Sequence, residues 1–259
     1  RAVLGVAADK TILVLIHGGS ITLGQFVLDH TAAIISAAYG GQAASQALAN
    51  VLYGEYNPTG KLAATMYPPS FAEELPIEEM GVRVGVGRTH LYYKGTPEFP
   101  FGHGLSYSAW TLQWADSTEE ESVSLELSSN APTLRLKMLV KNEGPRRGRQ
   151  TVLLFWKPNF LTGMQQKLIG FQGTKDLDIG EEEGLEFELH IDDLKIWDDS
   201  KKEMTIPTGK HHILEARASN TVLQKTLHLV DNNNNPEPTF RHFTATSVAA
   251  VLRYFQSIY

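Results

Sequence analysis

Apolar residues change their spacing twice along the chain, and each change indicates a different kind of structure. In the first third, the continuous apolar run Thr11–Ile16 precedes His-Gly-Gly-Ser, and a second run covers residues 32–38. Such runs are typical of strands buried on both faces of a parallel sheet. Helical spacing over residues 42–53 predicts a helix that ends at Gly54, and residues 61–67 are predicted as a third strand. This order of strands and helices predicts an α/β layer.

From about residue 120 the apolar residues instead alternate with polar ones. Clear examples are the segments 123–127, 134–141 and 185–191, and further strand-like runs are 151–156, 211–218 and 222–230. Glycine- and proline-containing turns separate these segments. Roughly seven short alternating strands predict an all-β sandwich of the immunoglobulin or fibronectin III type.

The chain is therefore expected to contain three regions. Residues 1–110 form the α/β part, residues 111–230 the all-β part, and residues 231–259 a linker with a C-terminal helix. The linker is rich in asparagine and proline. One face of the predicted helix carries a set of apolar residues, Val248, Val251, Leu252, Phe255 and Ile258. This face either packs on its own protein or binds a partner.

Composition excludes several classes of function. The chain has 259 residues, a formal net charge of -6 and no cysteine. An acidic chain lacks the electrostatic footprint of a nucleic-acid-binding protein, and disulfides and thiol chemistry are impossible without cysteine. The longest apolar run is too short to span a membrane. We expect no nucleic-acid partner, no membrane span and no cofactor.

Several candidate motifs lack a spacing or a partner motif that their function requires. Residues 54–61 resemble a phosphate loop, but five residues separate the two glycines instead of four. His17-Gly-Gly-Ser20 resembles an oxyanion loop, but the nucleophile elbow G-x-S-x-G is absent. His211 and His212 are adjacent in a predicted strand and cannot chelate one metal together. The four glutamates at positions 73, 74, 78 and 79 have no spacing that indicates a catalytic pair.

The order of short motifs is more informative. The family resemblance is carried by six stretches, Ile12–Gly19, Ala38–Gln42, Ala47–Leu62, Thr65–Pro68, Gly87–Thr89 and Phe99–Tyr107. They are similar to glycoside hydrolase family 3, and most similar to its β-xylosidase-like branch. Residues 167–171, 192–194 and 207–209 similarly resemble the fibronectin-type-III-like domain that follows in that family. The resemblance covers about residues 1 to 230. It implies the C-terminal half of an α/β sandwich domain followed by a fibronectin-like domain.

The resemblance also implies what this sequence lacks. The family's catalytic Asp lies in an N-terminal (β/α)₈ barrel, and in this branch the catalytic Glu precedes the strand matched by residues 12–16; neither region is present. No catalytic residue can therefore be assigned. Thr22 stands where the family usually has Asp, and Gly40 where it usually has Pro. Both changes fall in loops at strand ends, where open α/β sheets bind ligands.

Two or three parallel strands leave unpaired backbone groups at their edges. We therefore expect a protein partner, a barrel-bearing chain or another component of an assembly, to complete the α/β sheet.

Two functions follow from the resemblance. In the first, the chain is the C-terminal part of a retaining β-glycosidase that removes terminal, non-reducing β-linked sugars, most readily xylose. His17, Ser20 and Arg88 are then the candidate substrate-binding residues, without any metal. In the second, the chain is a structural or carbohydrate-binding remnant of such an enzyme. The family's habit of secretion implies an extracellular location.

Overall fold

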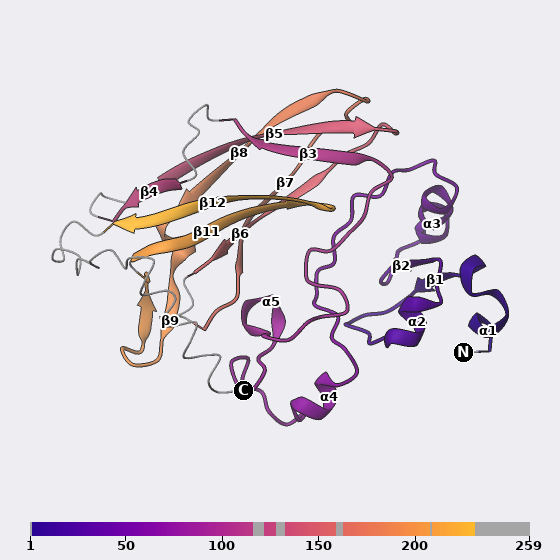
Figure 1. Ribbon diagram of the computed structural model, residues 1–259, viewed down its shortest axis with the longest axis horizontal. Coiled ribbons are helices and arrows are strands. Elements are labelled where there is room, and N and C mark those ends of the chain that lie inside the picture. The colour runs from indigo at the N-terminus through magenta and orange to yellow at the C-terminus, as the bar shows by residue number, and fades with distance from the viewer. Residues whose placement is uncertain (1, 116–121, 128–132, 159–162, 208, 231–259) are drawn as a thin grey trace, which may run out of the picture.

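The computed structural model describes residues 2–115, 122–127, 133–158, 163–207 and 209–230, and these residues form two parts joined by long loops (Figure 1). The N-terminal part contains helices, two short strands and the loops that carry α4 and α5. Its elements are α1 (Leu4–Ala7), η1 (Ala8–Lys10), β1 (Ile12–Leu15), α2 (Gln25–Asp29), β2 (Ala33–Ser36), α3 (Ala44–Leu52), α4 (Phe71–Glu74) and α5 (Thr89–Tyr92).

The predicted parallel pairing is present. β1 and β2 run parallel with Ile12 opposite Ala33 and Leu15 opposite Ser36. The prediction that the first strand is buried on both faces is wrong, because Ile12 is 48% exposed and Ile16 beyond its end is 71% exposed. The described residues provide only these two strands for the parallel sheet, so its apolar side chains lack the cover that a larger sheet would give them.

The predicted third strand over residues 61–67 is also wrong. This segment forms a single bridge, Met66 with Phe99, and otherwise exchanges backbone hydrogen bonds with the loop around residues 102–103. Its partner is a proline-punctuated loop that is not itself a strand. An apolar run indicates that a segment is buried, but it does not predict which segment lies beside it.

Helix α3 fits its sequence pattern closely. The backbone N–H groups of Tyr53 and Gly54 donate to the carbonyls of Ala49 and Val51 in its last turn. Gly54 then has a φ of +77°, a left-handed conformation that side chains disfavour. The predicted end of this helix at Gly54 is therefore confirmed.

The C-terminal part is a β-sandwich, drawn in magenta to yellow in Figure 1. One sheet has three strands in the order β3-β5-β8, and the other has five in the order β4-β12-β11-β6-β7. The strands are β3 (Ala109–Trp114), β4 (Ser122–Glu126), β5 (Thr133–Gly144), β6 (Thr151–Lys157), β7 (Lys167–Gly173), β8 (Glu182–His190), β11 (Gly209–Ala218) and β12 (Thr221–Val230). A turn η3 (Ile191–Leu194) leads to the separate hairpin β9 (Ile196–Asp198) and β10 (Glu203–Thr205).

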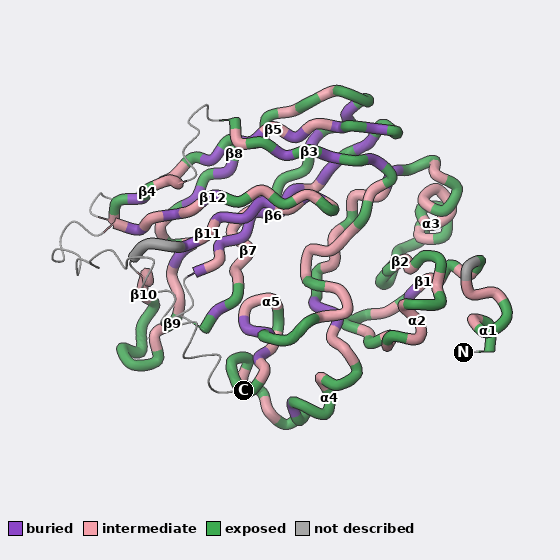
Figure 2. The backbone as a smooth tube through the Cα atoms, viewed as in Figure 1, coloured by how far each residue is buried: buried purple, intermediate pink, exposed green. Residues whose placement is uncertain are grey.

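The core of the molecule lies between these two sheets, where Figure 2 shows most of the buried chain. In β5 and β8 the buried residues alternate with exposed ones, as the sequence pattern predicts. Met138, Leu154 and Trp156 are almost fully buried in this core. Burial of apolar side chains at about 25 cal/mol per Å² makes this core the main source of stability.

The segments predicted from alternation are all strands in the structure. The pattern missed β3 and β7, and it missed the hairpin β9–β10. The predicted C-terminal helix lies outside the described residues. Within the described residues, no helix is long and apolar enough to cross a membrane.

Candidate functional site

The loop after β1 lies at the carboxyl end of the parallel pair, where open α/β sheets bind their ligands. The register places Leu15 beside Ser36, and the His17 ring reaches across, with Nε2 2.9 Å from the Ser36 hydroxyl oxygen. His17 Nδ1 contacts the Gly19 carbonyl. Because a carbonyl oxygen only accepts, the His17 ring donates from Nδ1 to Gly19.

Ser20 is held by a distant segment. Its hydroxyl donates to the carbonyl of Thr65 at 2.7 Å, and the Thr22 hydroxyl donates to the carbonyl of Tyr67 at 3.0 Å. The loop after β1 is therefore fastened to the segment 65–67, not only to its own turn. Thr22 makes this contact at the position where the resemblance would place an Asp.

Arg88 lies in the loop before α5. Its Nη2 donates to the carbonyl of Pro76 at 3.1 Å and to that of Glu79 at 2.8 Å. The guanidinium also lies over the ring of Phe71, 5.7 Å from its centroid, and Nε is buried without a hydrogen-bond partner. Within the described residues no carboxylate pairs with Arg88, so its charge is balanced by carbonyl dipoles and an aromatic face.

An aromatic cluster connects Arg88 to the loop that carries Ser20. The rings of Tyr67 and Phe71 are stacked with centroids 4.0 Å apart, and Tyr93 meets Tyr67 edge-on at 4.9 Å. The backbone N–H of Thr89 donates to the Tyr67 hydroxyl at 2.7 Å. Burial, followed by the charge of the Glu74 carboxylate, raises the pKa of Tyr93, so its hydroxyl stays protonated.

The structure thus brings together two of the three candidate residues. Ser20 and Arg88 are linked through Thr65, Tyr67 and Phe71 into one wall made of loops. His17 belongs to the same loop as Ser20 but bonds toward Ser36 and β2. Sequence reasoning missed Tyr67 and Phe71; their only signal was an aromatic pair on either side of Pro68-Pro69.

The nearby glutamates have structural roles. Glu79 Oε1 accepts from the backbone N–H of Gly81 at 2.8 Å. Glu98 accepts from the N–H groups of Leu23 and Gly24 at 2.9 and 2.7 Å, and so holds the entrance of α2. The described residues contain no group of three or more His, Asp or Glu that would hold a metal.

The wall is joined to the sandwich by a second set of contacts. Buried Asn57 accepts from the Ser106 hydroxyl at 2.9 Å and from the Tyr107 N–H at 2.8 Å. Lys61 Nζ donates to the Gly104 carbonyl at 3.1 Å and to Gln150 Oε1 at 3.3 Å. These contacts tie the N-terminal part to the segment before β3 and to Gln150, which directly precedes β6.

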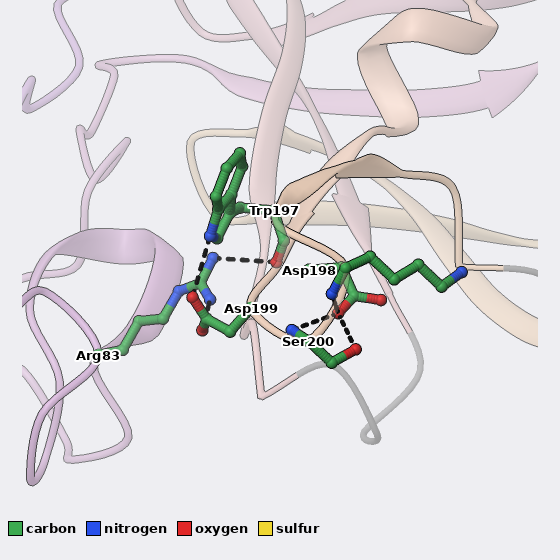
Figure 3. Close-up of polar contacts among 6 residues, drawn as sticks. Arg83, Trp197, Asp198, Asp199 and Ser200 are labelled. Carbon is green, nitrogen blue, oxygen red and sulfur yellow. Dashed lines mark hydrogen bonds and ion pairs between the residues drawn. The ribbon is translucent and has the colours of Figure 1, made fainter.

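Arg83 makes a further junction, shown in Figure 3. Its Nη1 pairs with Asp199 Oδ2 at 2.9 Å and its Nη2 donates to the Trp197 carbonyl at 3.3 Å. The Trp197 indole N–H donates to the other Asp199 oxygen, also at 2.9 Å. The loop before Arg88 is thereby tied to the hairpin β9–β10.

Two family models match the chain. Residues 2–107 match the glycosyl hydrolase family 3 C-terminal domain, and residues 150–219 match a fibronectin type III-like domain. The candidate wall lies inside the first match.

Curated relatives and solved structures agree with these matches. Beta-xylosidase/alpha-L-arabinofuranosidase 1 of Medicago sativa subsp. varia is 30% identical over an alignment of 235 residues, and the match covers 81% of this chain and 30% of the relative. Beta-D-xylosidase 1 of Arabidopsis thaliana is 36% identical over an alignment of 191 residues, and the match covers 62% of this chain and 25% of the relative. This chain therefore spans about a quarter to a third of the length of these relatives.

Among solved structures, DesR, a beta-glucosidase from Streptomyces venezuelae in complex with D-glucose, superposes with a TM-score of 0.64 at 26% identity. It covers 85% of this chain and 29% of the DesR chain. The GH3 exo-beta-xylosidase XlnD superposes with a TM-score of 0.70 at 23% identity, over 90% of this chain and 33% of that one. At that identity the second match supports the fold alone.

Proposed function

Because this chain belongs to glycosyl hydrolase family 3, carrying its C-terminal domain and the fibronectin type III-like domain, we propose that it acts as the C-terminal part of a retaining β-glycosidase. In this proposal the barrel-bearing region supplies both catalytic carboxylates, and this chain supplies one wall of the sugar pocket. The observation that carries the proposal is the occurrence of two matching domains in the family's order.

The chemistry assigned to the barrel is a double displacement. Retaining glycosidases hold two carboxyl groups roughly 5 Å apart, one as the nucleophile and the other as acid and then base. The glutamates of the described wall are engaged with backbone N–H groups or lie exposed on α4 and in the turn after it, which supports placing the catalytic pair elsewhere. The role of this chain is then binding and orientation of the sugar.

The wall offers groups suited to that role. Ser20, already a donor to Thr65, has hydroxyl lone pairs with which to accept from a sugar hydroxyl. Arg88 has N–H donors beyond those bonded to Pro76 and Glu79. We propose that His17, Ser20 and Arg88 contact or orient the substrate, and that the substrate is a terminal β-linked xylose, as the names of the plant relatives suggest.

The parallel sheet is the proposed contact with the partner region. β1 and β2 pair only with each other among the described strands, so each has a free edge. An added strand would satisfy these backbone groups and cover Ile12. An extracellular location remains a prediction from the family resemblance.

A reconstitution assay tests the proposal. The chain is co-expressed with the barrel-bearing region of a plant β-xylosidase relative, and hydrolysis of an aryl β-xyloside is measured for each part and for the mixture. We expect turnover only from the mixture, and we expect Arg88→Ala to raise KM because it removes binding groups. Arg135→Ala, an exposed change on the outer face of β5, is the matched control.

Two outcomes would overturn the proposal. Turnover by the isolated chain would show that catalytic carboxylates lie within it. Turnover by the barrel-bearing region alone, unchanged when this chain is added, would show that this chain contributes nothing to catalysis.

One observation favours a second function, a non-catalytic module of a larger assembly. Thr22 occupies the place of the family's usual Asp and is engaged with the Tyr67 carbonyl, and Gly40 replaces the usual Pro. Purification from the native source followed by mass spectrometry separates the two functions. A stoichiometric barrel-bearing chain, or a single longer polypeptide, supports the enzyme; other structural proteins in its place support the module.

A further inference from the structure

An open surface cavity of about 390 Å³ lies where the end of α3 meets the sandwich, and it shares no residue with the wall that carries Ser20 and Arg88. It is lined by five residues, Leu52, Tyr53, Gly54, Tyr107 and Arg146. Three of them end helix α3, one precedes β3, and one belongs to the connection between β5 and β6. Its volume falls in the lower part of the range of small-ligand pockets, about 300–1,000 Å³.

Hydrogen bonds between the two parts hold the cavity walls in place. The Tyr107 hydroxyl donates to the Val51 carbonyl at 2.7 Å, and Arg146 Nη1 donates to the Gly54 carbonyl at 2.9 Å. The Arg146 guanidinium lies 3.3 to 3.4 Å from the position that a Cβ on residue 54 would occupy. A glycine at this position lets the guanidinium lie close against the end of the helix.

Two of the lining side chains, Tyr53 and Arg146, have groups that are available to bind a ligand. Tyr53 is 84% exposed, and the described residues provide no hydrogen-bond partner for its hydroxyl. The Arg146 guanidinium has five N–H donors, of which one is engaged, and no described carboxylate pairs with it. An exposed aromatic ring beside free donors suits a ligand that has both an apolar face and hydroxyl groups.

The local charge selects a neutral ligand over an anion. The C-terminus of a helix carries a partial charge of about −0.5, which offsets part of the positive charge of Arg146. Exposed Glu55 follows directly after Gly54 in the sequence and adds a negative charge close to the same end of the helix. A ligand whose oxygens are uncharged hydroxyls therefore fits better than a carboxylate or a phosphate.

We propose that this cavity binds a neutral saccharide of one or two rings, with the C–H face of one ring on Tyr53 and its hydroxyls at Arg146. The proposal concerns binding and does not depend on whether the chain takes part in glycoside hydrolysis. A site of this kind would hold the protein to a polysaccharide.

Titration of the full 259-residue chain with neutral disaccharides tests this proposal. Xylobiose and cellobiose are added separately, and the chemical shifts of the tyrosine rings and of Arg146 Nε–H are followed by NMR. We expect saturable shifts with at least one of the two neutral sugars, and weaker binding of glucuronate. Tyr53→Ala should weaken binding about tenfold, whereas Tyr53→Phe, which keeps the ring, should stay within about threefold.

Arg146→Gln should also weaken binding about tenfold, and Arg147→Gln serves as its control, since Arg147 pairs with Asp178. Thermal melting of each variant separates lost binding from lost folding, because Arg146 also contacts the end of α3. Absence of a saturable shift with both neutral sugars would overturn the proposal. So would tighter binding of glucuronate, or binding that Tyr53→Ala leaves unchanged.

Discussion

Lys61 shows what a single charged residue does at the junction between the two parts. Its amine donates to Gly104, Gln150 and Ser219 Oγ, all uncharged acceptors. Burial lowers its pKa to about 8, because the cationic form loses hydration that these acceptors replace only in part. Nearby His103 also has a lowered pKa, first from burial and then from the charge of Lys61.

Because of Lys61, the free energy of unfolding should change with pH in the alkaline range. Between about pH 8 and the ordinary lysine pKa of 10.5, the unfolded chain binds a proton at Lys61 that the folded chain has lost. The free energy of unfolding should therefore rise through this interval, by at most about 2 kcal/mol between pH 7.5 and 9.5. Urea unfolding of the wild type and of Lys61→Met measures it; an equal rise in both proteins would contradict the assignment.

Single residues were the hardest feature to predict from the sequence. The sequence indicates Ser20 by its place after a strand and Arg88 by its place in a family motif, and the structure joins them through Tyr67 and Phe71. The role of these two aromatic residues comes from contacts between different chain segments, which the spacing of residues along one segment cannot predict. The substrate-binding role of the three chosen residues stays a prediction.

Whole elements were easier to predict where they repeat a period. Alternation predicted β5 and β8 because their inner faces share one core, and helical spacing predicted α3. The loops around α4 and α5 carry no such period. Their shape depends on backbone geometry, as in Gly87, which has a φ of +77° and lies against the carbonyl oxygen of Tyr92.

Gly87 should therefore tolerate no side chain. A Cβ at this position would lie 2.1 Å from the Tyr92 carbonyl oxygen, far inside van der Waals contact, so Gly87→Ala should cost about 3 kcal/mol or more. Gly19→Ala is the matched control, because its Cβ would meet nothing within 4 Å. Chemical unfolding of both variants measures the difference. Equal stability of the two would show that this loop rearranges freely.

At the scale of the whole molecule, the two parts share one polar junction. Asn57 bonds to Ser106 and to Tyr107, and Gly148 of the β5–β6 connection lies close against its side chain. The sequence predicted both parts and their order, since each has its own pattern. It could not predict the junction, which is made of single polar residues from segments far apart in the chain.

Substitution of Asn57 should lower the stability of both parts of the molecule. Asn57→Ala removes a buried side chain and leaves the Tyr107 N–H, whose hydrogen bond to Asn57 is partly buried, without its acceptor, at a cost of about 1–2 kcal/mol. We expect faster amide hydrogen exchange in α3 and in β3 alike. Asn50→Ala in α3 removes only an exposed hydrogen bond with Gln46 and should stay within about 0.5 kcal/mol. Faster exchange confined to one part would show that the two parts open independently.

The hairpin β9–β10 gives the molecule a natural optical reporter. Trp110 and Trp156 are buried in the sandwich, whereas Trp197 is 42% exposed and shares Asp199 with Arg83 of the N-terminal part (Figure 3). If the loop of Arg83 withdraws from the hairpin, the indole loses a neighbouring cation and meets more water. The emission of Trp197 should then shift to the red and become more open to quenching by acrylamide, so that separation of the two parts can be followed by fluorescence without an added label.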